Sequence, residues 1–118
     1  MLYAMKTKLV RVIDGDTVVL DLDLGLRIHS IQPIRLHGID APELHGVTDP
    51  APGLAAKAFL EAELAKGPLR VLITTEDKYG RWLGIIWWGS GNTTEMRLSV
   101  NQAMITAGYA KPYSGGKR

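Results

Sequence analysis

The sequence has no cysteine among its 118 residues and only three histidines, at positions 29, 37 and 45. Without cysteine the chain can form no disulfide bond and no cysteine-ligated zinc site. The three histidines are too scattered to predict a zinc site of their own. Folds held together by disulfides or by a cysteine-ligated zinc ion are therefore excluded.

The sequence also lacks long apolar runs and a strong excess of one charge. No stretch approaches the roughly 20 apolar residues that span a bilayer, and the first ten residues hold no apolar run of signal-peptide length. We therefore expect a cytoplasmic protein with no membrane partner, although a chain whose signal had been removed would read the same. The net charge of +2 is compatible with a polyanionic partner but too small to imply one.

The composition is that of an ordinary folded domain, with 46% hydrophobic and 22% charged residues, and this argues against disorder. A chain of this length buries roughly two thirds of its unfolded surface, which is enough for a core. No repeat or linker interrupts it. We expect one domain over residues 1–118, as a monomer, with a dimer as the alternative.

Hydrophobic periodicity predicts five strands and two helices. The strands are expected at residues 8–13, 18–24, 26–39 (broken near Pro33), 68–75 and 81–88, and the helices at 53–66 and from Ser99, with a capping box to Gln102, to Gly108. The order β-β-β-α-β-β-α predicts a mostly β, α+β protein, the five-stranded Greek-key barrel of the OB-fold. An antiparallel α+β sheet of another topology is the alternative.

A barrel of this order could bring three carboxylates and two arginines together at one end. These residues are Asp16, Arg35, Asp40, Glu43 and Arg81. Carboxylates suit Ca²⁺ or Mg²⁺, arginines bind phosphate oxygens, and a third carboxylate could activate water. Together they describe phosphodiester hydrolysis.

Each of these residues also has a plain structural interpretation. Asp14 and Gly15 form a common turn pair, and the two arginines could make ordinary ion pairs with Glu43 and Asp77.

Three segments, in order, resemble the staphylococcal nuclease (thermonuclease) family: "VIDGDTV", "RLHGIDAPE" and "DKYGRWLG". "VNQAMITAGYAK" at residues 100–111 resembles the segment that follows that family's barrel. The resemblance implies an OB-fold and a Ca²⁺-dependent endonuclease with little sequence specificity. Its substrates would be single-stranded or melted DNA and RNA, cut at the 5′ P–O bond to leave 3′-phosphate ends.

The resemblance also implies a role for individual residues. Metal ligands fall on Asp16, Asp40 and the backbone carbonyl of Ala41; phosphate-binding arginines on Arg35 and Arg81; the water-activating base on Glu43; and nucleotide-pocket residues on Lys78, Tyr79 and Tyr113. Asp14 falls at the edge of the metal site. Tyr113 is the weakest match, because "KPYSG" departs from the family's spacing.

Three departures from the family bear on these expectations. Alanine stands at position 41 where the best-known member has threonine, which changes little because only the carbonyl is a ligand. The segment between Asp16 and Arg35 is longer, which could alter substrate access. The sequence ends at Arg118, so the family's third helix is absent, and we expect lower stability or oligomerisation as a result.

Two other functions remain to be weighed. A catalytically inactive OB-fold module that binds nucleic acid or protein could keep these residues by descent, although a pure binder has no need of Glu43. A calcium-binding EF-hand beginning at Asp14 would need a bidentate glutamate at position 25, where this sequence has Gly25. The EF-hand interpretation is therefore rejected.

Overall fold

The computed structural model describes residues 4–89 and 91–114. Within these residues the elements are β1 (Met5–Asp14), β2 (Thr17–Asp23), β3 (His29–Leu36), β4 (Ile39–Asp40), α1 (Ala51–Leu64), β5 (Leu69–Glu76), β6 (Trp82–Trp88), the 3₁₀ helix η1 (Met96–Leu98), α2 (Val100–Thr106) and β7 (Lys111–Pro112). No helix in this part of the chain is both long enough and apolar enough to cross a membrane.

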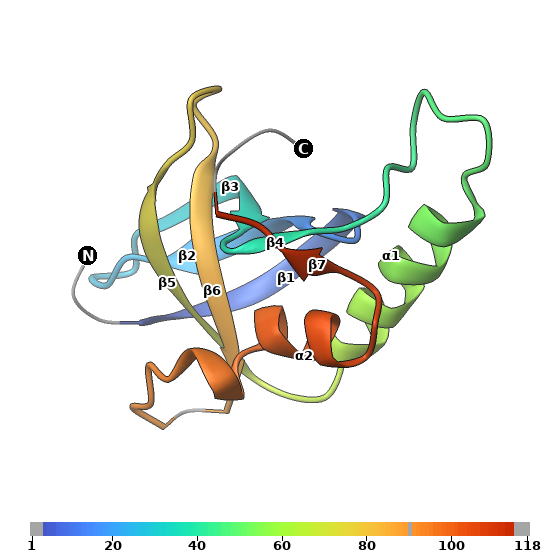
Figure 1. Ribbon diagram of the computed structural model, residues 1–118. Helices are drawn as coiled ribbons and strands as arrows, with labels where there is room; N and C mark the ends of the chain where they lie inside the picture. The colour runs from blue at the N-terminus through green and yellow to red at the C-terminus, as the bar shows by residue number, and fades with distance from the viewer. Residues whose placement is uncertain (1–3, 90, 115–118) are drawn as a thin grey trace.

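Five strands close into a barrel in the order β1-β2-β3-β6-β5, with β5 returning to pair with β1. All neighbours are antiparallel except β3 and β6, which run parallel where residues 34–36 pair with residues 82–84. α1 lies in the connection between the third and fourth barrel strands (Figure 1). This arrangement is the OB-fold barrel predicted from the order of the elements.

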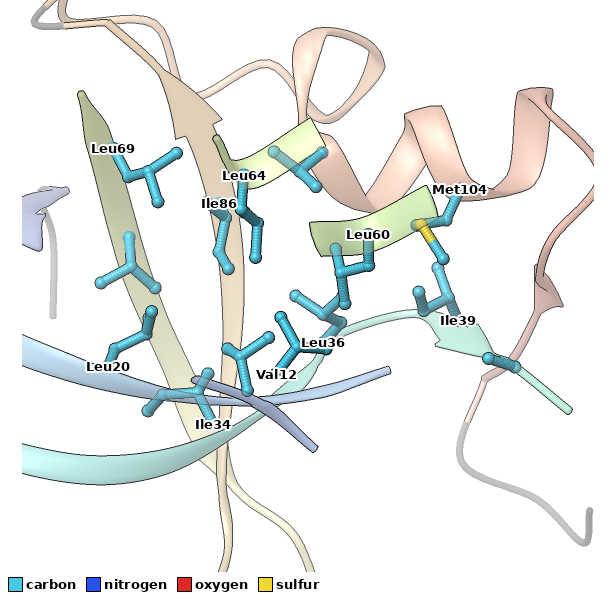
Figure 2. Close-up of a cluster of buried hydrophobic side chains, with 14 of the residues drawn as sticks. Val12, Leu20, Ile34, Leu36, Ile39, Leu60, Leu64, Leu69, Ile86 and Met104 are labelled. Carbon is cyan, nitrogen blue, oxygen red and sulfur yellow. The ribbon is translucent and has the colours of Figure 1, made fainter. Parts of the chain in front are cut away.

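The barrel interior is filled by the alternating apolar residues of its strands. Val18, Leu20 and Leu22 on β2 are buried, as their spacing predicts. Figure 2 shows leucine and isoleucine side chains from the barrel strands packed together with Leu60 and Leu64 of α1. The helix thereby covers the barrel interior, and its apolar face is buried against the barrel rather than exposed to solvent.

Both helices form where the periodicity predicts them, with shifted ends. α1 begins two residues earlier than expected, because proline is tolerated in the first turn of a helix, where its missing N–H has no partner anyway. α2 begins as expected: the Ser99 hydroxyl accepts the Gln102 N–H at 3.0 Å. The prediction about a third helix concerns the segment after Ser114, which lies outside the described residues.

The third strand does not break at Pro33 as predicted. β3 runs from His29 to Leu36, and the chain turns only at residues 37–38, where Gly38 has a φ of +79°. Pro33 is accommodated because β3 pairs with β6 only from Ile34 onward, so the earlier half of the strand needs fewer ladder hydrogen bonds. The true break places the short strand β4 beside β7, at the mouth of the barrel (Figure 1).

Candidate active site

The turn between β1 and β2 is built so that the Asp16 side chain faces the β4 segment. Asp14 Oδ1 accepts the Asp16 N–H at 3.1 Å, which closes the turn. A Cβ on Gly15 would lie 2.7 Å from the Cβ atoms of both Ala41 and Ala56, so only glycine allows this close packing. Asp16 Oδ2 then accepts the Ala41 N–H at 2.9 Å. Asp14 therefore shapes the turn, and Asp16 is the carboxylate presented to the site.

Arg35 links this turn to the β4 segment. Its guanidinium Nη2 lies 3.5 Å from a carboxylate oxygen of Asp16 and 3.5 Å from one of Asp40. Its Nη1 donates to the carbonyl of Ile39 at 3.2 Å. Arg35 is only 1% exposed, so these contacts are shielded from bulk water. Removing one partner of a buried ion pair leaves the other charge buried without compensation, so the three charges depend on one another. The alternative pairing of Arg35 with Glu43 is not what the structure shows.

Tyr113 covers Arg35. The centroid of its ring lies 5.7 Å from the guanidinium carbon, within the range of a cation–π contact. The backbone N–H of Tyr113 donates to the Gly38 carbonyl at 2.9 Å, which fixes the segment after β7 over the turn after β3. The weakest sequence match is thus brought to the centre of the site, where it limits access to the guanidinium.

Carboxylates gather on this side of the barrel. The Arg35 guanidinium lies between the carboxylates of Asp16 and Asp40, and the Asp14 carboxylate lies beside Asp16 in the turn. Burial raises the pKa of Asp14 to about 6, helped by a hydrogen bond with Asp16 and repulsion from its charge.

The described residues contain no group of three or more histidine, cysteine, aspartate and glutamate side chains placed to hold a metal ion. The two side-chain ligands predicted from the sequence, Asp16 and Asp40, nevertheless share one guanidinium nitrogen, and Asp16 is hydrogen-bonded to Ala41, the third predicted ligand residue. Carboxylate and carbonyl oxygens are the hard ligands that a cation such as Ca²⁺ prefers, with water at its remaining positions.

Glu43 lies on the loop that follows β4, close to the carboxylate cluster. It is exposed, and it lines a pocket together with Asp40 and Ala41. Its backbone is held against the first turn of α1, where a Cβ on Gly53 would lie 2.5 Å from the Glu43 carbonyl oxygen. The helix therefore fixes the loop, and the carboxylate is left open to solvent, as a water-activating base requires.

Arg81, Lys78 and Tyr79 form a separate cluster at the tip of the β5–β6 hairpin. Lys78 Nζ and Arg81 Cζ lie 5.3 and 5.6 Å from the centroid of the Tyr79 ring, which is 73% exposed. Arg81 Nε also pairs with Asp77 at 2.8 Å, so its predicted ion pair is confirmed. Arg35 is the register partner of Leu83 on β6, so Arg81 lies just before β6, two residues ahead of the level of Arg35.

Asp77 organises this tip and gives a pH-dependent prediction. Its burial would raise its pKa, but hydrogen bonds from the Arg81 and Tyr79 N–H groups, and the Arg81 guanidinium, lower the pKa below 3.8. An acid with a lowered pKa stabilises the fold above its unfolded pKa and loses that contribution as the pH falls through its folded pKa. Asp77→Ala should therefore reduce the free energy of unfolding by about 1 kcal/mol at pH 7.

That difference should shrink below pH 3.8, which urea unfolding of both proteins at pH 7, 5 and 3 measures. A difference that stayed constant over this range would show that the charge of Asp77 contributes nothing.

A comparison with family models adds a decisive observation. The model of the staphylococcal nuclease homologues matches residues 33–117. The chain belongs to this family. No curated protein matches the chain at a significant level. The matched range contains the predicted site residues from Arg35 to Tyr113, and membership of the staphylococcal nuclease homologues identifies a nuclease-type domain that binds nucleic acid. Asp16 precedes the range, and its contacts with Ala41 and Arg35 place it in the same cluster as these residues.

One residue that holds the site of this staphylococcal nuclease homologue together was not predicted from the sequence. Asn101, on α2, is fully buried, and its Nδ2 donates to the carbonyls of His37 at 2.9 Å and Gly84 at 3.0 Å. Its Oδ1 accepts the Ile86 N–H at 3.1 Å. A polar residue beside the inward-facing Val100 was the available signal, because buried polar side chains need partners.

Proposed function

We propose that the protein is a Ca²⁺-dependent endonuclease that hydrolyses phosphodiester bonds of DNA and RNA with low sequence specificity. The observation that supports this most directly is the joining of Asp16, Arg35 and Asp40 in one buried cluster, within a nuclease family. A module that only bound nucleic acid would have no use for a guanidinium held between two carboxylates beside an exposed glutamate.

Asp16, Asp40 and the Ala41 carbonyl would hold the cation. When bound, it would withdraw electron density from the phosphate and offset the negative charge of the cluster. Arg35 is positioned to keep the two carboxylates apart and correctly directed, because it contacts both. Its guanidinium would also bind a phosphate oxygen on the side that the Tyr113 ring leaves open.

Glu43 would accept a proton from the attacking water. The water oxygen bonds to phosphorus, the P–O5′ bond breaks, and the O5′ atom takes up a proton to become a 5′-hydroxyl. The other product keeps a 3′-phosphate. Arg81 would bind the phosphate oxygens as negative charge builds on them, and its pairing with Asp77 holds its side chain ready.

Lys78 and Tyr79 would contact the nucleotide next to the scissile bond. An exposed tyrosine ring flanked by two cations can stack on any base while the cations approach a phosphate. Contacts of this kind do not read base edges, which accounts for the low sequence specificity that we propose.

The experiment that tests this proposal measures degradation of single-stranded DNA and of RNA by the purified protein. Both should be cleaved with millimolar Ca²⁺ and remain intact once the ion is chelated. Full cleavage in chelator would overturn the metal assignment, whereas intact nucleic acid with Ca²⁺ but binding to the protein would favour the inactive OB-fold module.

A further inference from the structure

A pocket lies next to the carboxylate cluster, between the Glu43 loop and the segment that joins α2 to β7. Residues 40–43 form one wall and residues 108–111 the other, and its volume is about 610 Å³. A cavity of this size can take one nucleotide. Because Asp40 and Ala41 belong both to this pocket and to the cluster, a group bound here is continuous with the phosphate site.

The wall made by residues 108–111 offers an aromatic ring and a cation. The Tyr109 ring is stacked on Phe59 of α1, with the ring centroids 4.5 Å apart and the planes at 21°, so its position is fixed. Lys111 is exposed on β7, and its register partner is Asp40 on β4. A fixed aromatic ring beside a lysine is the combination that binds the base and phosphate of one nucleotide.

The position of Glu43 decides which nucleotide this is. In-line attack places the water, and therefore its base, on the side of the phosphorus opposite the leaving O5′ atom. Glu43 lines the pocket, so the pocket lies on the attacking side, away from the nucleoside that leaves. The nucleotide that keeps the 3′-phosphate is attached through O3′, which lies in the equatorial plane between the attacking and leaving oxygens, so this nucleotide can reach the pocket.

We propose that this pocket is a subsite for the nucleotide on the 5′ side of the scissile phosphate, with Lys111 binding that nucleotide's own 5′-phosphate and Tyr109 contacting its base. The inference rests on the proposed nuclease function and extends it. Two subsites thus flank the scissile bond: the Tyr109–Lys111 pocket on its 5′ side and the Lys78–Tyr79 tip on its 3′ side.

Three short substrates with one cleavable bond each test the subsite. They are the dinucleoside monophosphate TpT, the same molecule with a 5′-phosphate (pTpT), and the same molecule with a 3′-phosphate (TpTp). For the wild-type protein, the 5′-phosphate should raise kcat/KM. Lys111→Ala should reduce the ratio of kcat/KM for pTpT to that for TpT about fivefold, because a charge-assisted contact is lost. In Lys78→Ala, the ratio that should fall is instead that of kcat/KM for TpTp to kcat/KM for TpT.

Lys8→Ala is the matched control. Lys8 is exposed on β1, six residues before Asp14 and so roughly 20 Å along the strand from the turn. Lys8→Ala removes the same charge as Lys111→Ala, and it should leave unchanged the kcat/KM ratios of pTpT to TpT and of TpTp to TpT. The subsite assignment would be wrong if Lys111→Ala lowered kcat/KM equally for all three substrates. It would also be wrong if this variant lowered only the ratio of kcat/KM for TpTp to that for TpT.

The outcome is separable from that of the nuclease proposal. A wild-type protein that cleaves TpT but gains nothing from the 5′-phosphate contradicts the subsite alone. A wild-type protein that cleaves none of the three contradicts the nuclease function, and calorimetric titration then judges the subsite. In that measurement pTpT must bind more tightly than TpT, and Lys111→Ala must abolish the difference; equal binding by both proteins overturns the proposal.

Discussion

Glu43→Gln should lower kcat for single-stranded DNA by about 10³-fold, the size of effect expected when a general base is removed. Glutamine keeps the shape of the side chain but cannot accept a proton from water at neutral pH. Because Glu43 is exposed and its loop is held through the backbone at Gly53, the free energy of unfolding should change by less than about 0.5 kcal/mol. Single-turnover cleavage and urea unfolding of the same preparations measure the two quantities.

Glu61→Gln is the matched control for this loss of charge. Glu61 is exposed on α1 and does not line the pocket beside the carboxylate cluster, so its substitution should leave kcat within twofold of wild type. Turnover by Glu43→Gln within a few-fold of wild type would remove Glu43 from the mechanism, and the base would have to be sought elsewhere.

Asn101→Leu should be the most destabilising substitution among those considered, lowering the free energy of unfolding by about 3 to 5 kcal/mol. Leucine has the same branching of its heavy atoms but is larger and cannot hydrogen-bond. The carbonyls of His37 and Gly84 and the N–H of Ile86 would then be buried without their present partner. Each buried group left without a hydrogen bond costs about 1 to 3 kcal/mol. Urea unfolding at pH 7 measures the change.

The same substitution should also disturb the backbone that positions the active site. The His37 carbonyl belongs to the turn that separates Arg35 from Asp40, and Asn101 holds this turn against β6. Gln102→Leu, one residue away, removes only an exposed hydrogen bond to Thr106 and should cost less than about 0.5 kcal/mol. If Asn101→Leu were no more destabilising than Gln102→Leu, the Asn101 hydrogen bonds would not hold the site together.

The barrel could be predicted from the sequence because its signals are local. The turn pair at Asp14 and Gly15 is confirmed, and so is Ser99 as the cap of α2. The Gln102 side chain bonds Thr106 instead of completing a capping box. The alternation along residues 18–22 holds for Val18, Leu20 and Leu22, but Val19 is buried as well. The break expected at Pro33 was wrong for a non-local reason. Whether a proline interrupts a strand depends on which neighbour needs its N–H, and β6 reaches β3 only after that point.

The site was predictable in its residue types but not in its contacts. Family resemblance placed Asp16, Arg35 and Asp40 in one site, and the structure joins them directly. The near-complete burial of Arg35 and the position of Tyr113 over it depend on how β7 returns to β4, which no local pattern encodes. The roles of Glu43, Arg81 and the cation remain predictions for the experiments above.

Mass spectrometry of one single-stranded oligonucleotide after incubation with the protein and Ca²⁺ tests the central claim most directly. We predict shorter fragments that carry 3′-phosphate and 5′-hydroxyl ends, and no fragments when Ca²⁺ is chelated or when Glu43→Gln replaces the wild-type protein for the same time. An intact oligonucleotide with Ca²⁺ would contradict the nuclease assignment. Fragments with 5′-phosphate ends would contradict breakage of the P–O5′ bond and, with it, the placement of the two subsites.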